Sequence, residues 1–416
     1  MFRILGMKQN NFLKINLIKK SINDFFKVKL GLSSSIPVFF ALFLLFSFHS
    51  ISIGQIFLVI TFIIWIVFLA TRKIRFQVPG YFWPLVVYVF LSLIASAASV
   101  NPTVSFQDSR ELLLFLIIPI VFTGFTRNQD VKIAMSALLI SASVSILYSF
   151  FCFFFRYTPG DRISGFMGHY MTQAGLLVLF SALALSIFLF AREKVRFVWG
   201  GMFILAAVAL VLTLTRSAWI GILVAGCVIL FLYKPKTLIL IPIVAGLFFV
   251  VSPKHIKNRA LTIFKRRSYS NMERLEYIHA GIMIIKEYLL FGTGPDTVDM
   301  VFQDPKYELS ESARRNVHLH NNFLQIAAER GIFSFLAWLT FVIWTLISLI
   351  KLTKNKDPSL RSLSIGALAG FFALLAAGLF EYNFGDSEIL VLLLFIITIP
   401  FVQEKISSKK WINTSE

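Results

Sequence analysis

Long apolar runs constrain this chain more than any other feature of its sequence. Phenylalanine, leucine, isoleucine and valine recur in stretches with few or no charges, and these stretches extend along most of the 416 residues. About 20 such residues can cross a bilayer as a helix, which satisfies its own backbone hydrogen bonds. With 57% hydrophobic residues and a mean hydropathy of +0.78, one compact soluble core is excluded. The sequence therefore predicts an all-α polytopic membrane protein.

Charged residues divide the apolar runs into about twelve expected transmembrane helices. Nine fall within residues 36–252 and three within residues 331–402. The expected spans are 36–49, 52–71, 81–100, 112–126, 133–155, 170–191, 197–214, 217–233, 237–252, 331–350, 362–380 and 389–402. The first and fourth are short for a spanning helix. Between the ninth and tenth spans lies one large loop, 253–330, which is predicted to contain amphipathic helices.

The segments at the two ends are expected to be extramembrane. In residues 1–35, Ile15, Ile18 and Ile22 recur at helical spacing among lysines. This pattern is typical of a basic amphipathic helix on an anionic membrane surface. A frayed tail explains the same composition equally well. Residues 403–416 are expected to form a second tail.

The distribution of lysine and arginine predicts that both termini are cytoplasmic. In that orientation the cytoplasmic segments hold 24 of the 40 lysines and arginines, and the outer segments hold 16. Twelve of those 16 belong to loop 253–330, which is too long to count under the positive-inside rule. All six histidines then lie on the outer side or at its edge. Acidic residues avoid the centres of the expected spans, which argues against an ion-coupled transporter.

Two arginines on the outer side are candidate binding residues. Arg216, in "TLTRSAWIG", lies between the seventh and eighth spans with almost no loop around it. A charge at that depth is unfavourable unless it reaches the interface or binds an anion, which makes Arg216 a candidate to bind an anionic ligand. The alternative is that Arg216 only marks the topology of the chain at a tight turn. Arg274 begins "RLEYIHAGIMIIKEYLLFGTGP", which predicts an amphipathic helix from Arg274 to about Leu290 on the membrane surface. Glycines then end that helix.

Two histidines precede the tenth span, in "NVHLHNNFLQIAAERGIF". His320 is expected at the N-terminus of a helix, where the helix dipole favours a neutral imidazole that can accept a proton. Residues two apart face different ways on a helix or a strand, so His318 and His320 are not expected to converge. Since no third ligand follows at a recognised spacing, the sequence predicts no metal site. Hydrogen-bonded structure is the alternative to catalysis for such a pair.

These motifs, in this order and with one large outer loop between them, resemble the O-antigen ligase and polymerase superfamily of lipid-linked polysaccharide enzymes. The resemblance covers roughly residues 80–400 and is most specific across 205–345. A single dominant loop late in the chain favours a ligase, because the polymerases typically have two. The ligase pattern of a histidine, a small polar residue and a glycine after nine residues matches His320, Asn321 and Gly331. Ser334 departs from the last position of the pattern.

The resemblance implies a catalytic role for His320 and binding of a donor diphosphate by Arg216 and Arg274. Further candidate substrate-binding residues are Arg162, His318 and Asn321. The implied reaction transfers a polysaccharide from undecaprenyl diphosphate to a sugar hydroxyl of lipid A core, at the periplasmic face of the bacterial inner membrane. It needs no cofactor or metal and inverts the anomeric configuration. The alternatives are an O-antigen polymerase, which joins lipid-linked repeat units, and a protein O-oligosaccharyltransferase. Membrane lipids are expected partners, and nucleic acid is not.

The charge distribution generates a topological prediction. A reporter that is active only outside the cytoplasm should be active when fused near residue 280, within the large loop. The same reporter should be silent when fused at residue 356, between the tenth and eleventh spans. The reverse pattern would place the large loop in the cytoplasm and would remove the outer-face site.

Overall fold

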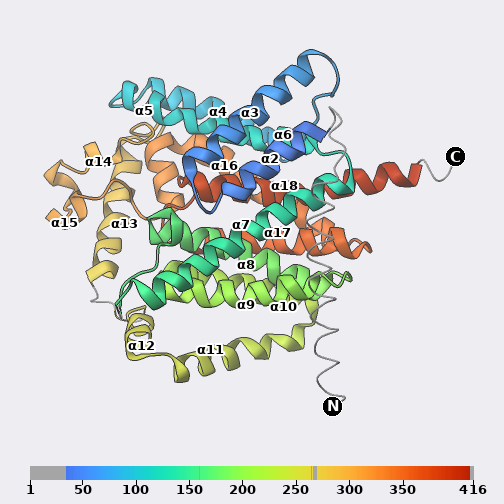
Figure 1. The fold of residues 1–416 in the computed structure, drawn as a ribbon. Helices are drawn as coiled ribbons and strands as arrows, with labels where there is room; N and C mark the ends of the chain where they lie inside the picture. The colour runs from blue at the N-terminus through green and yellow to red at the C-terminus, as the bar shows by residue number, and fades with distance from the viewer. Residues whose placement is uncertain (1–33, 159, 264, 266–268, 413–416) are drawn as a thin grey trace.

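The computed structural model describes residues 34–158, 160–263, 265 and 269–412, and these ranges contain helices and connecting loops without a β-strand (Figure 1). The first nine expected spans correspond to α2 (Ser35–Phe46), α3 (Ile51–Ala70), α4 (Phe82–Ala97), η2 (Ser109–Leu116) with α6 (Ile117–Gly124), α7 (Asn128–Phe155), α8 (Tyr170–Phe190), α9 (Arg196–Leu212), α10 (Arg216–Tyr233) and η4 (Pro235–Ile239) with α11 (Leu240–Val251). The last three correspond to α16 (Asn322–Leu352), α17 (Pro358–Ala377) and α18 (Ser387–Ile412). Short connecting helices are α5 (Pro102–Asp108) and η3 (Gly165–Met167). The all-α polytopic membrane fold is confirmed.

Seven helices in the described ranges are long and apolar enough to cross a membrane. They are α3, α7, α8, α10, α16, α17 and the α18 stretch Ser387–Ser408. Four shorter apolar helices, Ser35–Phe46, Phe82–Ala97, Arg196–Leu212 and Pro235–Val251, accompany them. Each expected span therefore contains helix, and the total of twelve crossings stays a prediction.

Several expected boundaries differ from the structure, and one expected helix cannot be compared with it. The fourth span is interrupted, because 3-10 helix η2 gives way to the short helix α6. The last helix continues past residue 402 to Ile412, so that most of the expected tail is helical. The predicted N-terminal amphipathic helix lies outside the described residues, apart from its last two positions, 34 and 35.

The centre of the bundle is formed by α8, α17 and α18, whose apolar segments are the most buried of the spanning candidates. Helix α17 packs against α8, α10, α16 and α18. At the periphery, α3 leaves large apolar side chains such as Ile56 and Ile63 more than half exposed. An apolar surface of this kind on a long helix is suited to lipid, which hides it without hydrogen bonds.

The segment between α11 and the membrane part of α16 forms a separate small layer at one end of the bundle. It comprises α12 (Lys254–Leu261), α13 (Tyr269–Glu287), α14 (Val298–Val301), η5 (Pro305–Tyr307) and α15 (Glu311–Arg314). Figure 1 shows α13, α14 and α15 gathered at this end, with the far end of α18 opposite. The layer has its own apolar core, which includes Tyr277, Ile284, Phe302 and Leu319. Its shape is therefore fixed by packing, and it can hold side chains against the bundle.

A helix, α13, is present where an amphipathic helix was predicted, but it spans Tyr269–Glu287 instead of Arg274 to about Leu290. It begins at Tyr269, so Arg274 lies in the second turn instead of the first. One face packs into the layer through Tyr277, Ala280 and Ile284. An exposed apolar stripe is formed by Leu275, Ile278 and Ile282 of α13 and by Leu289 just beyond its end, each between 41% and 46% accessible. This stripe is suited to contact with lipid.

Gly331 interrupts α16 and lets a neighbouring segment cross it. Its backbone has φ 73° and ψ 174°, outside the helical region. The segment after α13 passes close by, because the Thr293 and Gly294 amides donate to the carbonyls of Ala328 and Glu329 at 2.9 Å each. A Cβ at residue 331 would overlap the carbonyl of Leu290. Gly331 thus divides α16 into a short part that carries polar groups and a long apolar part.

A Gly331→Ala substitution should destabilise the protein strongly. A backbone with this φ and ψ is essentially restricted to glycine and disfavours alanine by about 1–3 kcal/mol, and the overlap with Leu290 adds to this. The measurement is the midpoint of thermal unfolding in detergent. The control is Gly226→Ala, within α10, where an added Cβ meets nothing within 4 Å. Equal midpoints for the two variants would contradict this account of the crossing.

Candidate functional site

Two loops are joined at the end of the bundle beneath the small layer. One precedes α16, and the other connects α17 to α18. The Asn322 amide donates to the carbonyl of Gly378 at 2.7 Å, and its side chain donates to Asn383 at 2.7 Å. In return, the amide of Phe384 donates to the Asn322 side chain at 3.0 Å. Because Asn322 is fully buried, this double exchange holds the two loops in one register.

The joined loops bring His318, His320 and Glu381 together. His320 Nδ1 lies 3.0 Å from Glu381 Oε1, and His318 Nε2 lies 3.8 Å from the same oxygen. The centres of the two imidazole rings are 4.3 Å apart. The expectation that the histidines would not converge is wrong. They precede the helix, and His320 has φ 49°, a left-handed backbone that turns both rings toward Glu381.

The buried setting controls the charges of this cluster. Burial lowers the pKa of His318, against the opposing effect of Glu381. Burial by itself would raise the pKa of Glu381, but the hydrogen bond with His320 and nearby positive charge, including Arg274, hold it below its usual value. Glu381 is therefore an anion at neutral pH, and His318 is a neutral imidazole.

A cavity of about 330 Å³ opens beside His320, and we call it the cationic cavity. Both arginines predicted to bind the donor line it, together with apolar residues such as Leu275 and Ile278 of α13. Arg274 donates through Nε to the carbonyl of Phe380 at 3.3 Å. This contact fixes the guanidinium and leaves its two terminal nitrogens without a hydrogen bond to the described part of the chain. Two nitrogens on one guanidinium can hold a diphosphate in bidentate fashion.

Arg216 lies in the same wall with a different set of contacts. One terminal nitrogen donates to the Thr262 carbonyl at 2.9 Å, and the other donates to Ser270 at 2.7 Å and to Asn271 at 2.9 Å. Its side chain is buried and ties the start of α10 to the start of α13. In this conformation Arg216 contributes charge to the cavity and fixes the position of Arg274's helix.

Arg162 supports the turn that carries Arg216, and it does not line the cationic cavity. Leu214, in this turn, has a left-handed backbone with φ 53°. Its carbonyl accepts hydrogen bonds of 3.2 Å from Arg162 and from Arg259. Burial, with repulsion from Arg259 and Arg274, lowers the pKa of Arg162 to about 10. The arginines therefore surround one turn that their hydrogen bonds hold in a strained conformation.

Asn321 has a structural part in the site. Its side chain caps α16 by accepting from the amides of Phe323 and Leu324 at 2.9 and 3.1 Å. It also donates to the carbonyl of Leu379 at 3.0 Å. Asn321 lines the cationic cavity as well, so its predicted contact with substrate stays a prediction.

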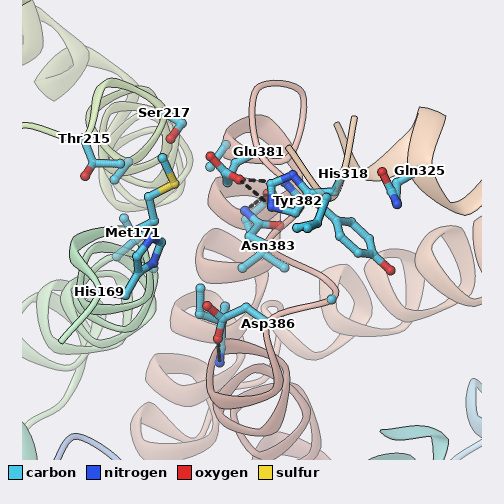
Figure 2. A pocket seen from close by; sticks show the side chains of 18 of the residues that line it. His169, Met171, Thr215, Ser217, His318, Gln325, Glu381, Tyr382, Asn383 and Asp386 are labelled. Atoms are coloured by element: carbon cyan, nitrogen blue, oxygen red, sulfur yellow. Dashed lines mark hydrogen bonds and ion pairs between the residues drawn. The ribbon is translucent and has the colours of Figure 1, made fainter. Parts of the chain in front are cut away.

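A second cavity, of about 370 Å³, lies on the other side of the histidine and glutamate cluster. Figure 2 shows it between Thr215 and Ser217 on α10, His169 and Met171 at the start of α8, and Glu381, Asn383 and Asp386 of the loop before α18. His318 and Glu381 form part of its wall, whereas His320 faces the cationic cavity. Ser217 lines both cavities, so the two adjoin at the cluster. This arrangement suits a reaction between two substrates.

Sequence reasoning missed Glu381 and Arg259. Glu381 belongs to "EYNFGD", which the predicted topology places on the same outer side as the histidines. That shared side indicated that Glu381 and the histidines could lie near one another. It could not predict that His320 and Glu381, separated by 61 positions in the sequence, form a pair. Arg259 lies in the basic stretch after α11, where its charge was visible and its contact with the Leu214 turn was not.

Comparison with known proteins agrees with the resemblance read from the motifs. Residues 201–339 match the family model described as O-antigen ligase, so this part of the chain is similar to that family. A protein of Haemophilus influenzae (strain ATCC 51907 / DSM 11121 / KW20 / Rd), described as uncharacterized, is 23% identical over 304 residues. The aligned region is 67% of this chain and 73% of the relative. The matched region includes Arg216, Arg259, Arg274 and the two histidines, but ends before Glu381.

Among the described residues, His318, His320 and Glu381 also form a group that could hold a metal ion, with one ligand atom from each within 4.8 Å. The set provides three ligands, one fewer than a closed zinc site. The hydrogen bond between His320 and Glu381 accounts for the approach of the same atoms without an ion.

We expect the purified protein to bind no stoichiometric metal at this cluster. After dialysis against EDTA and then against micromolar Zn²⁺, elemental analysis should find far less than one ion per chain. Glu381→Gln, which keeps the shape of the side chain and removes its charge, is the matched control. One tightly held ion in the wild type that is lost in Glu381→Gln would make the cluster a metal centre.

Proposed function

We propose that this membrane protein is an enzyme that transfers a polysaccharide from undecaprenyl diphosphate to a sugar hydroxyl of lipid A core. The match of residues 201–339 to the O-antigen ligase family model supports this proposal. The observation that carries the proposal is His320, held by Glu381 at the edge of a cavity that also contains Arg274 and apolar side chains. The proposed site faces the periplasm, and both termini lie in the cytoplasm.

The cationic cavity has the chemistry that a lipid diphosphate requires. Arg274 offers two terminal nitrogens to the diphosphate, and Arg216 adds positive charge from the wall. The exposed stripe of α13, which includes Leu275 and Ile278 of the cavity lining, offers a surface for the polyprenyl chain. As the bond between the anomeric carbon and the phosphate oxygen breaks, negative charge grows on the diphosphate. The guanidinium groups stabilise that charge without a metal.

His320 is proposed to be the general base. With Nδ1 donating its proton to Glu381, the lone pair of Nε2 can accept the proton of the acceptor hydroxyl. The oxygen then attacks the anomeric carbon from the side opposite the leaving diphosphate, which inverts its configuration. Glu381 holds the imidazole in the required tautomer and stabilises the imidazolium that forms, as carboxylates do in histidine triads.

A polymerase of the same superfamily would use nearly the same groups, and the cellular products distinguish the two functions. Loss of a ligase leaves lipid A core bare while full-length polymer accumulates on its carrier. Loss of a polymerase leaves core capped by a single repeat unit. A protein acceptor would be indicated if lipopolysaccharide were normal and a glycosylated exported protein were lost.

His320→Ala should reduce transfer by a factor of about 10² to 10⁴, the usual contribution of a general base. His318→Ala should be milder, because His318 makes the longer contact with Glu381. The measurements are transfer by the purified protein and the lipopolysaccharide ladder of cells that carry each variant as their one copy.

The matched control is His279→Ala, which removes an exposed histidine of α13. It should leave the ladder unchanged. A single-unit cap in the His320→Ala strain would replace the ligase assignment by a polymerase. A wild-type ladder in that strain would remove His320 as the base under either assignment.

A further inference from the structure

The cavity on the far side of the cluster is strongly acidic. Six carboxylates line it, namely Asp108, Glu111, Asp296, Glu329, Glu381 and Asp386, and its described lining includes no lysine or arginine. We call it the acidic cavity. Arg330 lies near it and pairs with Asp108 at 3.2 Å. Burial raises the pKa of Glu329 to about 8 and that of Glu111 to about 7, so at neutral pH the lining carries fewer than six full negative charges, against one guanidinium. The cavity therefore attracts positive charge and repels anions.

The carboxylates extend from the opening to the interior. Glu111 and Asp296 are exposed, whereas Glu329 and Glu381 are buried. Glu381 is 8% exposed, and its Oε2 has no hydrogen-bond partner in the described chain. A buried carboxylate oxygen without a donor is rare, because leaving it unpaired is unfavourable. Glu381 thus places an unpaired acceptor within the wall of the cavity, beneath its accessible surface.

The polar lining also suits a sugar ring. The side chains of Gln325, Asn383 and Thr215 line the same space, which at about 370 Å³ lies in the size range of small-ligand pockets. Hydroxyl groups donate strong hydrogen bonds to carboxylates, since bonds to an ionised acceptor are stronger than neutral ones. The cationic cavity next to it differs in both respects, because it is mostly apolar and carries arginines.

We propose that the acidic cavity receives a ring of the acceptor glycan that is neutral or carries an amino group, and that it rejects rings with a phosphate or carboxylate substituent. This inference rests on the proposed function. The opposite charges of the two cavities then direct each substrate to its own side: the diphosphate enters the cationic cavity, and the hydroxyl-rich acceptor enters the acidic one. Ser217 and the histidine cluster lie where the two substrates meet.

The test measures sugar binding separately from transfer. Saturation-transfer NMR on the full-length protein in nanodiscs would compare methyl glucoside, methyl glucosaminide and methyl glucuronide. We expect the glucuronide to bind at least about fivefold more weakly than the glucoside, and the glucosaminide at least as tightly, because charge effects are large at low dielectric. In Glu111→Gln/Asp296→Asn, the ratio of glucoside to glucuronide binding should fall to about twofold or less.

The substitutions are chosen to preserve the fold. Both side chains are exposed, and the left-handed backbone of Asp296, with φ 55°, is one that asparagine adopts readily. The control is Glu193→Gln, an exposed residue between α8 and α9, which should keep the wild-type ratio.

Three results would each overturn the proposal: equal binding of the three sugars, a wild-type ratio in the double variant, or no binding of either the glucoside or the glucosaminide. Failure of the proposed function gives a different result. His320→Ala should lose transfer and keep the order of sugar binding, because Glu111 and Asp296, whose charges are expected to set that order, are not part of the pair that His320 forms with Glu381. Retained transfer in His320→Ala would therefore reject the proposed mechanism while the binding order stands.

Discussion

The hydrogen bond between His320 and Glu381 links the parts of this site. Glu381 is almost fully buried, and an isolated carboxylate there would be neutralised or would disfavour the fold. Pairing with His320 keeps it ionised, and removing one partner from a buried pair typically costs about 3–5 kcal/mol. The bond can form because the hydrogen bonds of Asn322 join the loop before α16 to the loop after α17. The proposed general base and the geometry of the two loops thus depend on the same few contacts.

The cluster also separates two environments of opposite charge. On one side Arg216 and Arg274 face apolar side chains of α13, and on the other a group of carboxylates surrounds a polar space. Each environment would be costly if it extended into the other, because like charges repel strongly where water is scarce. Burial lowers the pKa of Arg274 in the cationic cavity, and the negative charge of Glu381, which lines the acidic cavity, opposes that shift. Glu381 therefore offsets part of the repulsion among the arginines there. The position of one carboxylate therefore suits both cavities.

The sequence predicted the helical architecture and the region of the site, but not its geometry. Apolar runs located the helices because a segment in lipid must form its backbone hydrogen bonds internally, as a helix does. The composition of each segment alone therefore indicates where a helix lies. Asn321 shows the limit of such reasoning. The motif match predicts a substrate-binding residue, whereas in the structure the Asn321 side chain caps α16. The turn at His320 was hidden because a left-handed backbone follows from the packing of neighbouring loops. Glu381 was hidden because its pairing joins segments far apart in the chain.

The division of α16 at Gly331 explains how one helix can serve both the membrane and the site. The part before the glycine carries buried polar groups, Glu329 and Arg330, which an apolar span would not tolerate without partners. The part after it is the apolar span. The interruption frees backbone groups that the Gly292–Gly294 segment satisfies, so the irregular backbone is covered by protein. A continuous helix would leave no room for that segment, and the small layer could then not hold Arg274 above His320.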